Sequence, residues 1–313
     1  MKKIYLSIVV PIYNEEANIS TLYKRLKTVL TKLRKNYEII FIDDGSDDSS
    51  PDKLKQLAAK DGNVVVLELT GNFGQHAAIM AGFKQSSGDI VITLDADLQN
   101  PPEEIPKLVA KMKEGYDIVG GWRKARCDSI FRKTPSFFLN ALSSRLFNLK
   151  LKDYGCMLRA YKKNIIKQVI QCPESITYIP ALANSFAKKI TEIPVQHSCR
   201  EKGKSKYGIM KLLRLNFDLM TGFSLLPIQL VGFAGIFVAL TGIGFAAFLF
   251  IRRLVVGPEV EGVFTLFAIL FIFIGLQILA LGILGEYIGR IYREVRKRPQ
   301  FIIKEIHKKK QSR

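Results

Sequence analysis

Short apolar runs alternate with amphipathic stretches along the first part of the chain. The runs predict strands at residues 6–10, 37–42, 64–67, 89–94 and 117–120, and apolar residues at helical spacing predict helices at 18–33, 50–59 and 75–85, with another starting at 101. Strands separated by helices form a mostly parallel sheet that is covered on both faces. We therefore expect an α/β domain over residues 1–207.

Two later segments, 225–251 and 263–285, contain no charged residue. Each is longer than the roughly 20 apolar residues that a helix needs to cross a bilayer. Basic residues lie on the outer side of both segments, as the positive-inside rule expects of cytoplasmic flanks. The chain begins with a strand pattern instead of a secretory signal. These features predict a hairpin of two transmembrane helices over 225–289, with both termini in the cytoplasm.

Two stretches near these segments, 135–151 and 208–224, combine an apolar stripe with basic residues. Helices of this kind lie in the membrane interface, although packing against the α/β domain is an open alternative. The formal net charge of +19 is concentrated around the apolar segments and in a basic tail, 290–313, where it would attract anionic lipid head groups. The aromatic and basic surface of a nucleic-acid binder is not evident. We expect membrane lipid as a partner and no nucleic acid.

Polar and mostly acidic loops follow three of the predicted strands, at 11–16, 43–46 and 95–99. The carboxyl ends of parallel strands meet at one edge of the sheet, which is where ligands of α/β proteins bind. Oxygen atoms of Asp97 and Gln99 suit a hard cation such as Mg²⁺, which commonly accompanies substrate phosphates. Turn formation would explain any one of these loops, but three together favour a nucleotide site.

Several enzyme classes lack their motifs in this chain. Neither a Walker phosphate loop nor a G-x-G-x-x-G sequence follows the first strand, which argues against kinases, ATPases and dinucleotide enzymes. The three histidines lie too far apart for a typical histidine zinc site. Arginine binds phosphate through two parallel hydrogen bonds, and basic residues between the sheet edge and the apolar segments could do so here: Arg123, Arg132, Arg200 and Lys206.

These motifs resemble those of the family 2 glycosyltransferases that charge polyprenyl phosphates, the group that contains dolichyl-phosphate mannose synthase. The resemblance rests on P-I-Y-N-E-E at 11–16, D-D-G-S at 43–46, D-A-D-L-Q-N-P-P-E at 95–103 and the paired apolar segments. The phrases at 74–83, 153–161 and 285–292 are more similar still to the bacterial branch that transfers 4-deoxy-4-formamido-L-arabinose to undecaprenyl phosphate during lipid A modification. The resemblance implies a GT-A fold and a multi-pass enzyme of the bacterial inner membrane.

The resemblance also implies roles for individual residues. Asp97 and Asp153 would be catalytic, and Mg²⁺ or Mn²⁺ would be bound by Asp95, Asp97 and Gln99. The phosphates of donor or acceptor would be held by Arg123, Arg132, Arg200 and Lys206. The UDP-sugar would be bound by Pro11, Tyr13, Glu15, Ile42, Asp44, Gln75, Asp95 and Ala96. A homo-oligomer, a tetramer in related proteins, is a further implication.

The expected reaction is a single inverting displacement at the anomeric carbon of a UDP-sugar by undecaprenyl phosphate. A phosphate monoester is mostly dianionic at neutral pH, because its second pKa lies near 6. Such a nucleophile hardly needs a general base. Two roles are open for Asp153, which could act as a base or position the sugar. Glucose, an N-acetylhexosamine or mannose are alternative sugars. A processive polysaccharide synthase is disfavoured because its Gln-x-x-Arg-Trp motif is missing. A non-catalytic nucleotide-sugar binder would not need Asp153 or the arginines.

Overall fold

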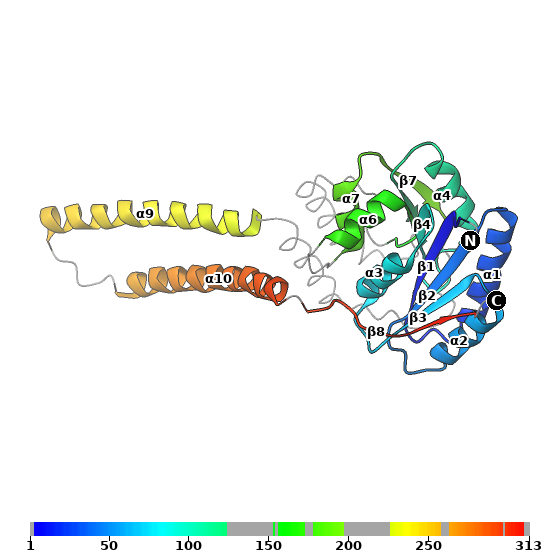
Figure 1. Cartoon of the computed structure of the whole chain (residues 1–313). Helices are drawn as coiled ribbons and strands as arrows, with labels where there is room; N and C mark the ends of the chain where they lie inside the picture. Colours follow the sequence, from blue (N-terminus) through cyan, green and yellow to red (C-terminus); the bar gives the residue numbers. More distant parts are fainter. Residues whose placement is uncertain are drawn as a thin grey trace. The chain divides into compact units, whose positions relative to one another are not determined.

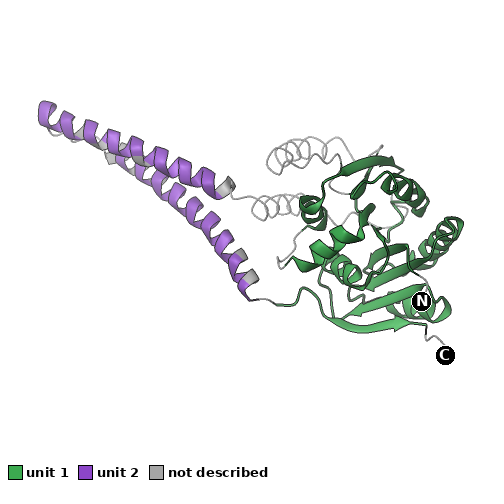
Figure 2. Cartoon of the chain, turned by 45° about the horizontal axis from the view of Figure 1, so that its top comes forward, with its two compact units in different colours: residues 1–144, 148–206, 298–313 green, residues 145–147, 207–297 purple. Residues whose placement is uncertain are grey.

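The computed structural model describes residues 3–123, 153, 156–172, 178–196, 226–257, 263–296 and 298–309. The chain divides into two compact units, each considered by itself. One unit comprises 1–144, 148–206 and 298–313, and the other comprises 145–147 and 207–297 (Figure 2). The first unit therefore contains both ends of the chain.

An eight-stranded sheet forms the centre of the first unit in the described part of the chain (Figure 1). The strands are β1 (Leu6–Ile12), β2 (Tyr37–Asp43), β3 (Val64–Leu69), β4 (Ile90–Thr93), β5 (Ile118–Arg123), β6 (Arg159–Lys162), β7 (Ile190–Val195) and β8 (Ile303–Lys308). Their order is β7-β5-β6-β4-β1-β2-β3-β8. The strands β4, β1, β2 and β3 are parallel, whereas β6 runs antiparallel to both β4 and β5.

Helices cover both faces of this sheet (Figure 1). One face packs on α1 (Ile19–Lys32), α2 (Ser50–Lys60) and α4 (Ile105–Met112), and the other on α3 (Gln75–Gln85), α6 (Lys163–Gln171) and α7 (Ile179–Phe186). The strands β1 to β4 are buried on both faces, which is why they appear in the sequence as continuous apolar runs. The predicted fold class, an α/β sheet of the GT-A type, is confirmed.

Predicted element positions agree with the structure to within a few residues in the first part of the chain. The helix predicted from residue 101 begins as the short 3-10 helix η1 (Pro102–Glu104) and continues as α4. Ser50 is the first residue of α2, as the predicted range of 50–59 has it, and Ser49 occupies the cap position. The elements from β6 to β7 had no prediction, because their short segments lack a clear period.

The last strand, β8, lies within the stretch that sequence analysis treated as a basic tail. It pairs antiparallel with β3, at the edge of the sheet. Its Lys304 and His307 contact the buried carboxylate of Glu68 on β3, which Lys55 of α2 also contacts. Phe301, just before the strand, packs against the core beside α3. Residues 298–309 are thus an integral part of the first unit, although their composition is that of a solvated tail.

The second unit contains two long apolar helices, α9 (Leu226–Val256) and α10 (Val263–Val295). Candidate spans within them are Ile228–Val256, with a mean hydropathy of 2.3, and Ile272–Gly289, with 1.8. Large apolar side chains along both helices are exposed, as they are in lipid-facing helices. Arg252 and Arg253, which follow the first uncharged segment, lie in the last turns of α9.

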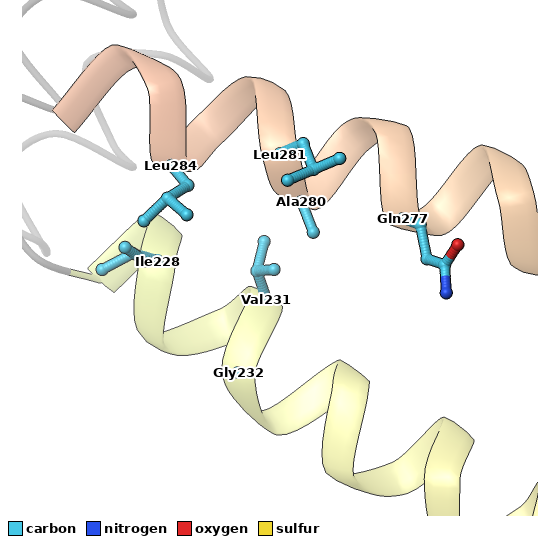
Figure 3. Close-up of a pocket in the computed structure, with 7 residues that line it drawn as sticks. All are labelled: Ile228, Val231, Gly232, Gln277, Ala280, Leu281 and Leu284. Carbon is cyan, nitrogen blue, oxygen red and sulfur yellow. The ribbon is translucent and has the colours of Figure 1, made fainter. Parts of the chain in front are cut away.

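The two helices leave an apolar groove of about 460 Å³ between them (Figure 3). It is lined by Ile228, Val231, Gly232, Gln277, Ala280, Leu281 and Leu284. Gln277 carries the only polar side chain of this lining. In a membrane, an amide at this position would favour a hydrogen-bonding partner on a neighbouring helix.

Candidate active site

The acidic loop after β4 places Asp95 at the centre of the sheet edge. Its Oδ1 accepts a hydrogen bond from Gln75 Nε2 at 2.7 Å, and its Oδ2 accepts one from Asn100 Nδ2 at 3.4 Å. Burial, and next the charge of Asp97, raise the pKa of Asp95 to about 7, against the opposing influence of Gln75 and Arg123. The carboxyl groups of Asp95 and Asp97 therefore interact, and that of Asp95 resists ionisation.

The turn after Asp95 is unusual in its backbone. Leu98 has a positive φ of 61°, a conformation that side chains other than glycine adopt at a cost and often at functional sites. This turn lets Asp97 Oδ1 accept a hydrogen bond from the backbone N–H of Gln99 at 3.1 Å. Ala96 between the two acids is buried. The strained turn thus fixes the direction in which Asp97 projects.

Asp44, after β2, is almost fully enclosed, with 3% exposure. Its Oδ1 accepts a hydrogen bond from the Phe73 N–H at 2.8 Å, and its Oδ2 accepts one from the Gly74 N–H at 2.9 Å. Burial raises the pKa of Asp44, and these two hydrogen bonds oppose that change. Asp44 therefore anchors the loop between β3 and α3, and Gln75, which contacts Asp95, follows that loop directly.

A glycine makes this junction possible. Gly45 has a φ of 70°, and a Cβ there would lie 2.5 Å from the carbonyl carbon of Gly71. No side chain fits such a gap, so the loops after β2 and β3 can approach this closely only through glycine.

The loop after β1 completes this half of the edge. Tyr13 is 38% exposed, and the carboxylate of Glu15 accepts a hydrogen bond from Asn18 at 2.6 Å. The loop is tied to the one after β2 through the Asn14 N–H, which donates to Ser46 Oγ, and the Glu15 N–H, which donates to Ser50 Oγ. An exposed aromatic ring and a carboxylate in one loop suit a nucleoside, whose base stacks on the ring and whose hydroxyls donate hydrogen bonds to the carboxylate. Pro11 and Ile42, also predicted for this site, lie at the ends of β1 and β2, where Ile42 belongs to the core.

Arg123, at the end of β5, forms a close pair with Asp153. Its Nε lies 2.6 Å from Asp153 Oδ2, its Nη2 lies 2.9 Å from Asp153 Oδ1, and its backbone N–H donates to Oδ2 at 3.3 Å. Asp153 is buried, at 2% exposure. Such a two-pronged pair fixes the plane of the guanidinium group. Arg123 also lowers the pKa of Asp95, so the arginine and the acidic loop belong to one site.

The structure brings together the predicted residues of the strand-end loops with Gln75, Arg123 and Asp153. Arg132, Arg200, Lys206 and both predicted interface helices, 135–151 and 208–224, lie outside the described residues. Sequence analysis missed Asn100, which contacts Asp95 from five residues further along the chain. It also missed the loop at 71–74, whose backbone N–H groups carry no sequence signal.

His76 follows Gln75 in α3, and burial lowers the pKa of its ring to about 4. The imidazole is therefore neutral at physiological pH, and it packs edge-on against Tyr178 with ring centroids 5.4 Å apart. The ring contributes no positive charge to the site.

The donor set at this edge fits a divalent cation. Asp95, Asp97 and Gln99 offer oxygen atoms, the ligand type that Mg²⁺ and Mn²⁺ prefer. The pKa of Asp95 is raised first by burial and next by the charge of Asp97, and a cation between the two carboxylates would stabilise their charged forms. Another group of possible ligands, Glu68, Glu305 and His307, lies on β3 and β8. There the lysines already compensate Glu68.

Comparison with known proteins agrees with this arrangement. The family model "Glycosyl transferase family 2" matches residues 7–170. Undecaprenyl-phosphate 4-deoxy-4-formamido-L-arabinose transferase of Edwardsiella ictaluri is 51% identical over 305 residues, which cover 96% of this chain and 94% of that protein. The protein of the same name from Klebsiella pneumoniae is 50% identical over 304 residues, covering 96% and 93%.

Solved structures show the same fold. Glucosyl-3-phosphoglycerate synthase of Mycobacterium tuberculosis, in complex with Mn²⁺, UDP and phosphoglyceric acid, superposes with a TM-score of 0.53 at 18% sequence identity. The match covers 70% of this chain and 76% of that one. With more than half of its residues matched by the family model and nearly its whole length by these relatives, the chain belongs to glycosyl transferase family 2.

Proposed function

We propose that this protein transfers 4-deoxy-4-formamido-L-arabinose from its UDP-linked donor to undecaprenyl phosphate, for the modification of lipid A. The observation that carries the proposal is the identity of about half of all residues, over 96% of the chain, to transferases named for this reaction. Such an enzyme needs a cluster of acids at the sheet edge, a cationic group beside it and membrane helices. The chain supplies the acidic loops, Arg123 in its pair with Asp153, and the two apolar helices.

The donor would be held at the ends of β1, β2 and β4. Tyr13 is exposed and would stack on the uracil ring, and the carboxylates of Glu15 and Asp44 would accept hydrogen bonds from the uridine. Asp95, Asp97 and Gln99 would hold Mg²⁺ or Mn²⁺ against the diphosphate. The cation would neutralise charge that develops on the leaving UDP.

The acceptor phosphate would bind near Arg123. Its dianionic oxygen attacks the anomeric carbon, the bond from that carbon to the diphosphate oxygen breaks, and UDP leaves. Both carboxylate oxygens of Asp153 contact Arg123, and the acceptor carries no proton that must be removed at neutral pH. We therefore assign Asp153 to orienting Arg123 rather than to acting as a general base.

Chain connectivity supports the proposed membrane topology. The two candidate spans lie between residues of the first unit, and the segment after the second span returns to the same sheet as β8. Segments that share one sheet must lie on the same side of a membrane, so the spans would cross it twice. We place this unit and both termini in the cytoplasm of the bacterial inner membrane. The tetramer stays a prediction.

A panel of donors tests the proposal. The purified protein in phospholipid nanodiscs is given undecaprenyl phosphate, Mg²⁺ and, in turn, the UDP derivatives of 4-deoxy-4-formamido-L-arabinose, glucose and N-acetylglucosamine, and GDP-mannose. We expect the highest kcat/KM with the formamido-arabinose donor. Preferential use of another donor would contradict the sugar assignment, and absence of any glycolipid would contradict the reaction.

A further inference from the structure

Arg159, on β6, has a completely buried guanidinium group that the sequence analysis did not consider. The residue is 0% exposed, and it pairs across the sheet with Thr93 of β4 and Gly120 of β5. Thr93 lies two residues before Asp95, and Gly120 lies three residues before Arg123. The guanidinium group is therefore placed inside the protein, directly behind the site.

Two hydrogen bonds join this group to the segment that carries Asp153. Arg159 Nη2 donates to the main-chain carbonyl of Asp153 at 2.8 Å, and Nε donates to the carbonyl of Cys156 at 3.0 Å. A planar guanidinium fork that holds two carbonyls at once fixes both their separation and their orientation. These bonds therefore determine where the backbone of Asp153 lies.

The neighbouring strand leaves space for this arrangement. A Cβ on Gly120 would lie 3.1 Å from Arg159 Nη1 and 3.3 Å from the side chain of Glu192. Glu192 Oε1 itself lies 3.9 Å from Arg159 Nη2. Glycine at position 120 thus lets the guanidinium group of Arg159 pack against β5.

Stability alone does not explain a charge at this depth. Replacing a buried ion pair by apolar side chains of similar volume is often neutral or stabilising, because the desolvation of the charges is avoided. Arg159 Nη1 also lacks a hydrogen-bond partner within the described part of the chain, which adds to the cost of burial. A buried charge with such a cost is best explained by the geometry that it imposes.

We propose that Arg159 is a positioning residue for the transfer reaction, an inference that rests on the proposed function. It holds the backbone of Asp153 from behind, Asp153 holds Arg123 through three hydrogen bonds, and Arg123 presents its charge to the site that contains Asp95. Displacement of a positioned group by about 1 Å can cost on the order of 100-fold in rate. Arg159 therefore acts on the phosphate site without touching the substrate.

A double-mutant cycle tests this chain of contacts. Wild type, R159K, D153N and the double variant are compared in the transfer assay, with melting temperatures measured for all four. Lysine keeps the charge but cannot hold two carbonyls in one plane. We expect R159K to lower kcat on the order of 10- to 100-fold, and to cost less than about threefold when D153N is already present, because coupled residues are not additive. R25K is the matched control, since Arg25 also forms a two-pronged pair, with Glu103 at the surface.

The nucleotide half of the site provides the second measurement. Uridine monophosphate, used as a competitive inhibitor, should keep its inhibition constant in R159K within about threefold, because Arg159 holds the carbonyls of Asp153 and Cys156 and not the loops proposed to bind the uridine. Three outcomes would each overturn the proposal. The losses of kcat in R159K and D153N could multiply in the double variant, R159K could keep the wild-type kcat, or R159K could lose kcat and inhibitor affinity equally.

A second variant covers the case in which R159K does not fold. G120A keeps the arginine but places a methyl group 3.1 Å from its Nη1, and we expect a fall in kcat with unchanged inhibition by uridine monophosphate. Wild-type kcat in a folded G120A would overturn the proposal. Inactivity of the wild-type protein would instead contradict the proposed function.

Discussion

Replacement of Asp44 by asparagine should disconnect the loop at 71–74 from the nucleotide site. In the wild-type protein both carboxylate oxygens accept backbone N–H bonds, from Phe73 at 2.8 Å and from Gly74 at 2.9 Å. The amide of asparagine can accept only one of these bonds, and its NH₂ group would face the other N–H donor. The loop then loses one bond to a charged acceptor and leaves a buried donor unpaired.

The expected loss follows from this geometry. An unsatisfied buried donor costs about 1–3 kcal/mol and a hydrogen bond to a charged group contributes about 1.5–3 kcal/mol. The neutral asparagine avoids the cost of burying a charge, the effect that raises the pKa of Asp44. We therefore expect a net loss of about 2–3 kcal/mol from the substitution. If that energy is taken from ligand binding, UDP affinity falls roughly 30- to 140-fold.

Calorimetric titration of UDP in the presence of Mg²⁺ measures this change. D47N is the matched control, because Asp47 lies in the same loop, is exposed, and uses its backbone N–H rather than its carboxylate to contact Asn14. We expect D47N to bind UDP as the wild type does. Wild-type UDP affinity in a folded D44N would refute the role given to this carboxylate.

Three further predictions concern the cation and the last strand. D97N should reduce turnover about 1000-fold while the melting temperature stays near that of the wild type, because the exchange weakens the hold on the cation that would neutralise the leaving diphosphate. An active D97N would remove the cation from the mechanism. Since the pKa of Asp95 is raised to about 7, a proton competes with the cation below that pH, and calorimetry should find Mg²⁺ binding about tenfold weaker at pH 6 than at pH 8; a flat profile would contradict this. Although burial acts to raise the pKa of Glu68, hydrogen bonds from Lys304, Lys55 and His307 lower it to about 2, so its contribution to stability is complete above about pH 4.5 and is lost as the pH falls toward 2. E68Q should therefore lower the free energy of unfolding by about 2 kcal/mol at pH 7, with the difference from wild type shrinking in acid; equal stabilities at pH 7 would contradict an anchoring role.

The sequence was most informative where one local pattern determines the outcome. Buried strands such as β1 and β3 stand out as apolar runs, and the acids at 95–97 follow a strand directly, so their place at the sheet edge could be predicted. The β8 strand could not be predicted, because Lys304 and His307 have the composition of a solvated tail and gain their partner Glu68 only through a contact 236 or more residues away.

The internal supports of the site were equally hidden. The contact of Asp44 with the nucleotide stays a prediction, and the structure adds that its carboxylate accepts hydrogen bonds from the backbone N–H groups of Phe73 and Gly74, which any sequence would supply. The sequence around Arg159 does not distinguish it from a surface arginine. Only the pairing of β5 with β6, which places Gly120 opposite Arg159, shows that it is buried. Contacts of this kind depend on tertiary structure and leave no local period.

The most direct test of the account is the dependence of UDP release on the lipid acceptor. The purified protein in nanodiscs receives UDP-4-deoxy-4-formamido-L-arabinose and Mg²⁺, with or without undecaprenyl phosphate, and both UDP and the mass of the lipid are followed. We expect one UDP for each glycosylated undecaprenyl phosphate, and no release without the lipid or after chelation of the cation. UDP release that is independent of the lipid, or a lipid whose mass never changes, would contradict it.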